Sequence, residues 1–149
     1  MQLDRAQICQ RIPHAGDMCL LDKMLAWDET HIKCSARSHL NPANPLRTGN
    51  TLTVMAAIEY AGQAMALHGG LITSESPGGN RPRKGYLASL RNIVVGRPVL
   101  DDLPGDLLIE VELLMGDNDS SLYVFAVSTA NTSVITGRAA VKLLEEMET

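Results

Sequence analysis

The longest apolar stretch of the chain lies between residues 51 and 70, where Glu59 is the only charged side chain. A helix that is apolar on every side packs inside a protein rather than on its surface. Alanine and glycine keep this segment thin, and larger apolar side chains fill the space around it. The pattern predicts a long buried helix, with Asn50 as its N-cap and Gly69-Gly70 as its stop.

Alternating apolar and polar positions, which are typical of half-buried strands, occur before and after this helix in the sequence. We predict strands over residues 18–27, 31–38, 86–96, 107–114, 121–130 and 134–144. The first two are joined as a hairpin, and a short helix over 3–10 opens the chain. The Gly/Pro-rich segment 74–85 is an expected loop. This order predicts a single α+β domain over 1–149 with a mostly antiparallel sheet.

Composition narrows the class of protein. With 45% hydrophobic and 20% charged residues, the chain is typical of a globular protein. Its net charge of −4 argues against nucleic-acid binding. No signal peptide or membrane span is predicted, which favours a cytoplasmic location. Cys9, Cys19 and Cys34 show no Cys-x-x-Cys spacing, so we expect reduced thiols rather than disulfides.

Glu59 is the first candidate for chemistry, because an acid within an apolar helix is unusual. Desolvation disfavours a charged carboxylate, so a buried Glu59 can stay protonated at neutral pH and act as a general acid. Gln63, one turn later, can orient that acid through a hydrogen bond. Two structural alternatives stay open: Glu59 can extend to the surface, or it can pair with Arg47 or Arg91.

His39 is the second candidate, since it ends a predicted strand and opens the proline-rich loop 39–50 before the helix. Loops beside rigid elements often carry catalytic groups, although a single histidine is more often structural. His68 falls in the expected last helical turn, where a cation suits the helix dipole. His31 and Cys34 lie three apart on a predicted strand and so face opposite sides. No metal site is predicted.

Three stretches of the sequence carry a family resemblance. They are RIPHAGDMCLLDKMLAWD (11–28), TLTVMAAIEYAGQAMALHG (51–69) and GYLASLRNIVVGRPVLDDLPGDLLIEVELL (85–114). In this order they resemble the hotdog-fold dehydratases that act on 3-hydroxyacyl groups of acyl carrier protein. The strings PHAGDMCLLD, NPLR and EYAGQAMALHGGL look closest to the divergent dehydratases of bacterial aryl polyene pigment pathways. The resemblance implies a curved antiparallel sheet wrapped around one long central helix.

The resemblance also implies a reaction, the reversible loss of water from a 3-hydroxyacyl thioester to give a trans-2-enoyl thioester. By similarity, His39 removes the proton α to the thioester carbonyl, and neutral Glu59, or a water it holds, protonates the departing hydroxyl. Backbone amides near Val54 polarise the carbonyl oxygen, because helix N-termini favour developing negative charge. Val54 and Gln63 are therefore the expected substrate-binding residues. The family implies no cofactor, since the substrate arrives on the phosphopantetheine arm of the carrier.

The chain departs from the family pattern at the loop before the helix. It has Ser-His-Leu-Asn-Pro over 38–42 where the family usually has Gly-His-Phe-Pro-Gly, and Val54 replaces a glycine. The interval from His39 to Glu59 is several residues longer than in the family. The loop must therefore fold back to bring the two side chains together.

Expected partners follow from the same resemblance. They are an acyl carrier protein and a second hotdog chain, in a homodimer, a higher oligomer or a heteromer with another dehydratase. A basic cluster supports a carrier, because carriers are acidic; it comprises Arg81, Arg83, Lys84 and Arg91. Two other functions stay open: a hotdog acyl-thioester hydrolase, and a non-catalytic subunit of a heteromeric dehydratase.

Overall fold

A computed structural model describes residues 2–12, 16–75, 85–117 and 119–144. Within these residues, seven strands form one antiparallel sheet in the order β1-β2-β3-β5-β6-β7-β4. The strands are β1 (Leu3–Asp4), β2 (Lys23–Trp27), β3 (His31–Ala36), β4 (Gly85–Val95), β5 (Leu107–Gly116), β6 (Ser120–Ser128) and β7 (Ser133–Leu143). The predicted strands and the β2–β3 hairpin are confirmed, with β2 starting later than expected because Gly16–Met18 forms a 3₁₀ helix.

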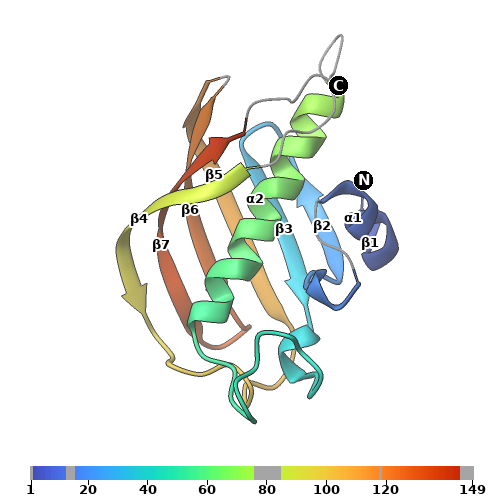
Figure 1. The fold of residues 1–149 in the computed structure, drawn as a ribbon, viewed down its shortest axis with the longest axis vertical. Helices are drawn as coiled ribbons and strands as arrows, with labels where there is room; N and C mark the ends of the chain where they lie inside the picture. The colour runs from blue at the N-terminus through green and yellow to red at the C-terminus, as the bar shows by residue number, and fades with distance from the viewer. Residues whose placement is uncertain (1, 13–15, 76–84, 118, 145–149) are drawn as a thin grey trace.

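One long helix, α2 (Met55–Glu75), lies across the face of the curved sheet (Figure 1). It packs against β3, β5 and β6, whose inward side chains are apolar and buried. Examples are Ile32, Ile109 and Phe125, none more than 1% exposed. The period-two pattern of the strands places these residues on one face, so the predicted α+β arrangement of a sheet around a central helix is confirmed. No helix within the described residues is long and apolar enough to span a membrane.

Both predicted ends of the long helix are wrong. The helix begins at Met55 rather than after Asn50, because the chain before it pairs with residues 98–101. It also continues through Gly69 and Gly70 to Glu75. A helical glycine costs about 1 kcal/mol relative to alanine. Burying a leucine contributes about 1.5–3 kcal/mol, and Leu71, directly after the glycines, is 1% exposed. Core packing therefore outweighs the glycine signal.

The expectation of three reduced thiols is also wrong, since Cys9 and Cys19 form a disulfide. Cys9 lies on the short helix α1 (Arg5–Arg11), which confirms the predicted opening helix. The Arg5 guanidinium donates to the backbone oxygens of Gly16 and Cys19, at 3.0 and 2.9 Å, and so holds that segment against α1. A disulfide that depends on contacts between separate segments leaves no short Cys-x-x-Cys spacing in the sequence. Cys34 is free, and burial raises the pKa of its thiol to about 12.

Strand β4 forms an edge of the sheet and is exposed along almost its whole length. Five of its large apolar side chains are at least 38% exposed, namely Tyr86, Leu90, Ile93, Val94 and Val95, while Leu87 is half-buried against the core. The middle of α2 lies beside this strand, since a Cβ on Gly62 would meet Leu87 Cδ1 at 3.9 Å. A long exposed apolar edge strand is a template for pairing with another chain.

Candidate functional site

The chain from β3 to α2 carries His39 and ends at the helix that carries Glu59. Residues 38–40 form a short 3₁₀ helix directly after β3, and the following loop returns to the first turn of α2. In Figure 1 this loop lies at the end of the sheet where α2 begins. His39 and Glu59 therefore belong to neighbouring elements at one end of the molecule.

His39 is fully buried, and its geometry suits a neutral base. Its Nε2 lies 2.9 Å from the backbone oxygen of Leu103. Because a carbonyl only accepts, Nε2 carries the proton and Nδ1 keeps a free lone pair. Nδ1 is buried and has no hydrogen-bond partner among the described residues. Burial is the main cause that lowers the pKa of His39, which favours the neutral form that can accept a proton.

Arg47 holds the loop in place. Its guanidinium donates to the backbone oxygens of His39, Asn41 and Asn50 at 2.9, 2.9 and 3.1 Å. These contacts hold the backbone of His39 and of the following loop in place. They also show that Arg47 serves the loop rather than pairing with Glu59, which was one structural alternative.

Glu59 is exposed in the single chain, so its expected burial is wrong for this chain alone. It shares its helix face with Met55, which is 64% exposed. His39 and Glu59 make no hydrogen bond or ion pair with each other among the contacts of the described residues. The alternative in which Glu59 extends to the surface matches the single chain. The sequence misleads here because it reports neighbours along the helix, not which element covers that face.

Gln63 and Val54 have structural partners that the sequence did not reveal. The Gln63 side chain is fully buried; its Oε1 accepts from Leu20 N at 2.9 Å and its Nε2 donates to Met18 O at 2.6 Å. The Gln63 side chain therefore holds the segment before β2, and its hydrogen bonds go to Leu20 and Met18 rather than to Glu59. The amide of Val54 donates to the backbone oxygen of Pro98 at 2.9 Å. This amide is therefore engaged within the chain, and the expected role of the backbone amides near Val54 stays a prediction.

A cleft of about 360 Å³ lies between the His39 loop and the segment before β2. Its walls include Arg37, Ser38 and Asn44, and neither His39 nor Glu59 lines it. The expected basic residues Arg81, Arg83 and Lys84 lie outside the described residues.

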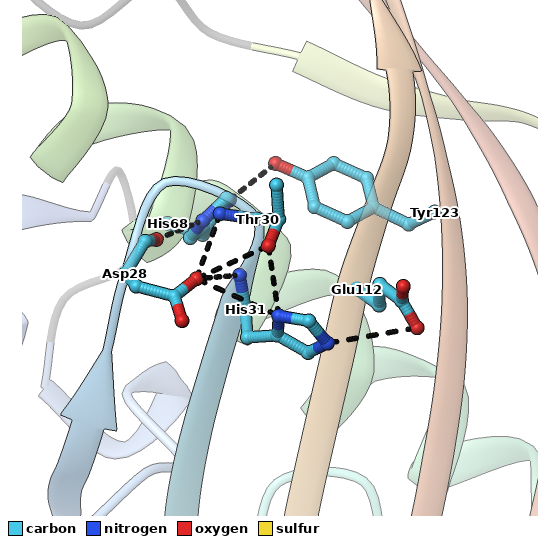
Figure 2. A network of polar contacts seen from close by, with 6 residues as sticks. All are labelled: Asp28, Thr30, His31, His68, Glu112 and Tyr123. Atoms are coloured by element: carbon cyan, nitrogen blue, oxygen red, sulfur yellow. Dashed lines mark hydrogen bonds and ion pairs between the residues drawn. The ribbon is translucent and has the colours of Figure 1, made fainter.

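A second polar network lies away from the His39 loop and ties α2 to the β2–β3 hairpin (Figure 2). His68 is fully buried; its Nε2 lies 2.9 Å from the Asp28 backbone oxygen and its Nδ1 2.9 Å from the Tyr123 hydroxyl. Nε2 must donate to the carbonyl, so the Tyr123 hydroxyl donates to Nδ1. The other residues in the figure are partly exposed: Thr30, His31 and Glu112. Burial lowers the pKa of His68, so the expectation of a cation at a helix end is wrong.

These two buried histidines make stability depend on pH. The unfolded chain binds protons at a pKa near 6.5, whereas burial lowers both folded pKa values. Below that pH the unfolded state binds more protons, so we expect the free energy of unfolding to fall as the pH falls through the folded pKa values. Thermal unfolding followed between about pH 8 and 5 checks this. His68→Gln should flatten the dependence; an unchanged slope would contradict the assignment.

The arrangement of one sheet curved around one long helix defines the class, the hotdog fold. Solved structures that share this fold include the following three. The dehydratase heterocomplex ApeI:P from Xenorhabdus doucetiae is 21% identical over 93% of this chain and 91% of that chain, with a TM-score of 0.80. A thioesterase from Haemophilus influenzae is 14% identical over 98% and 94%, with a TM-score of 0.67. A mutant thioesterase from Pseudomonas aeruginosa is 10% identical over 95% and 94%, with a TM-score of 0.64.

The family model for ApeP-like proteins, described as ApeP dehydratase, matches residues 6–149. The chain belongs to this dehydratase family, which confirms the resemblance to the aryl polyene-type dehydratases. No protein with a curated function matches the chain.

Proposed function

We propose that this chain dehydrates a 3-hydroxyacyl thioester, carried by an acyl carrier protein, to the trans-2-enoyl thioester in aryl polyene biosynthesis. The observation that carries the proposal is the match of nearly the whole chain, residues 6–149, to the ApeP dehydratase family. The site adds chemical support, because a buried neutral histidine and a helix carboxylate are an acid–base pair suited to removing water.

In this mechanism His39 and Glu59 divide the two proton transfers. Nδ1 of His39 takes the proton from the carbon α to the thioester carbonyl. The electron pair of that C–H bond forms the double bond as the C–O bond of the hydroxyl breaks. Glu59, in its protonated form, donates its proton to the leaving hydroxyl, which departs as water. Leu103 keeps the proton of His39 on Nε2, so Nδ1 is the atom that acts.

We propose that a second hotdog chain completes this site. Glu59 and Met55 are exposed on α2, beside the exposed apolar strand β4. A second chain that pairs along β4 buries this apolar surface and excludes water from Glu59. The similar ApeI:P structure is a heterocomplex of dehydratases, which supports a heteromer here over a homodimer.

The carrier and the location are part of the same proposal. Arg91, exposed on β4, can contribute to docking an acidic carrier protein. The reaction needs no cofactor beyond the phosphopantetheine arm that brings the thioester. We propose a cytoplasmic location. Disulfides are uncommon in that compartment, so the Cys9–Cys19 disulfide is an exception to the usual pattern.

The test incubates the full chain, alone and with a co-expressed second dehydratase, with a 3-hydroxyacyl thioester of acyl carrier protein. Mass spectrometry should show loss of one water from the carrier-bound acyl group. Release of free thiol without loss of water supports the alternative, a thioesterase. This alternative is kept because two of the structures with a similar fold are thioesterases. Activity that survives only in the second chain identifies this chain as a non-catalytic subunit.

A further inference from the structure

The buried hydroxyl of Tyr60 lies at the centre of a polar network that the mechanism does not use. Tyr60 follows Glu59 on α2 and is 0% exposed. Its hydroxyl oxygen lies 2.6 Å from Ser38 Oγ and 3.2 Å from Asn44 Nδ2. Ser38 directly precedes His39. The network therefore joins the residue before one candidate catalytic group to the residue after the other.

The directions of these hydrogen bonds follow from their partners. Ser38 Oγ lies 2.7 Å from the backbone oxygen of Leu20, which only accepts, so the serine donates its one proton there. Ser38 must then accept from the Tyr60 hydroxyl. Asn44 Nδ2 can only donate, so it donates to the Tyr60 oxygen. The chain of donors runs in one direction, from Asn44 through Tyr60 and Ser38 to Leu20.

The same network closes the His39 loop on itself. Asn44 Nδ2 also donates to the backbone oxygen of Ser38 at 2.9 Å, and its Oδ1 accepts from Leu46 N at 2.9 Å. Asn44 is 6% exposed. A buried polar group left without its partner is destabilising, so this geometry is strongly preferred over a shifted loop.

We propose that Tyr60 is a positioning residue for the dehydration: its hydroxyl fixes the turn that carries His39 relative to the helix that carries Glu59. This inference rests on the proposed function. The lengthened loop leaves His39 far from Glu59 along the chain, and the Ser38–Tyr60 hydrogen bond restores a direct link between the two elements. A displacement of about 1 Å in such a site can cost on the order of 10²-fold in rate.

The test compares Tyr60→Phe with the wild-type chain in the complex that shows activity. The variant keeps the buried ring and removes only the hydroxyl. We expect kcat to fall by about 10-fold to 10²-fold, with KM little changed, because substrate contacts are kept. Ser38→Ala should lower kcat similarly, and the double variant should be no worse than either single variant, since both remove the same link. Ser38→Ala also keeps the test decisive if Tyr60→Phe does not fold.

Tyr123→Phe is the matched control. Tyr123 is also buried, and its hydroxyl donates to a buried side chain, Nδ1 of His68. We expect its variant to lose comparable stability while keeping kcat. Wild-type kcat in Tyr60→Phe, or an equal loss of kcat in both variants, overturns the positioning role. An inactive wild-type complex instead contradicts the proposed function, so the two failures are distinguishable.

Titration of the histidine ring protons by NMR gives a readout that needs no activity. Loosening the turn admits water to His39, so in Tyr60→Phe its pKa should rise toward 6.5 while that of His68 is unchanged. Tyr123→Phe should change His68 and leave His39 as it is. An unchanged His39 titration in Tyr60→Phe overturns the proposal.

Discussion

Glu59→Gln is expected to lower kcat for dehydration by about 10²–10⁴-fold, the usual contribution of a general acid. Glutamine has nearly the same shape and can accept or donate hydrogen bonds, but it has no proton to give to the leaving hydroxyl. Because Glu59 is exposed in the single chain, the free energy of unfolding of that chain should be unchanged. Loss of water from the carrier-bound thioester, followed by mass spectrometry, measures the effect.

Glu112→Gln is the control for this prediction. Glu112 is another partly exposed carboxylate, on β5, and its side chain lies 3.6 Å from Nε2 of His31 rather than near α2. Its variant should keep full activity. Full activity in Glu59→Gln, with the complex intact, would show that the acid comes from elsewhere, such as the second chain.

The sheet could be predicted from the sequence because strand patterning is local. Alternation such as that over 109–113 tells which side chains face the core, whatever the strand order. The ends of α2 could not be predicted, because they depend on contacts between distant segments. Leu52 N donates to Asp101 Oδ1 and Val54 N to Pro98 O, and these bonds replace the helical turn expected after Asn50.

The sequence supplies the residue types of the candidate site, whose catalytic roles stay a prediction, and only part of its geometry could be predicted. His39 stood out by its place at the end of a strand, and its burial and neutral tautomer agree with a base. The exposure of Glu59 could not be predicted, since it depends on which element covers that face of α2, and among the described residues Glu59 stays exposed. The disulfide could not be predicted for a similar reason, because the packing of the Cys19 segment against α1, to which Arg5 contributes a hydrogen bond, does not show in the cysteine spacing.

His39→Gln is expected to lower kcat by about 10²–10⁴-fold. The glutamine amide can still donate to Leu103 O, so the variant removes the free Nδ1 lone pair and keeps a donor for that carbonyl. In the wild-type complex, the acid limb of kcat/KM should lie below pH 6.5, because burial lowers the pKa of His39 and keeps it neutral at higher pH. This limb should be absent from any residual activity of the variant.

His68→Gln separates loss of the base from loss of stability. Both histidines are fully buried, and each has Nε2 at 2.9 Å from a backbone oxygen. The two variants should therefore lose similar amounts of unfolding free energy, which denaturant titration measures. Only His39→Gln should lose catalysis, because Nδ1 of His68 accepts from Tyr123, while Nδ1 of His39 has no partner in the part of the chain that the structure describes. Equal activity in the two variants would mean that His39 is a buried structural residue like His68 and does not act as the base.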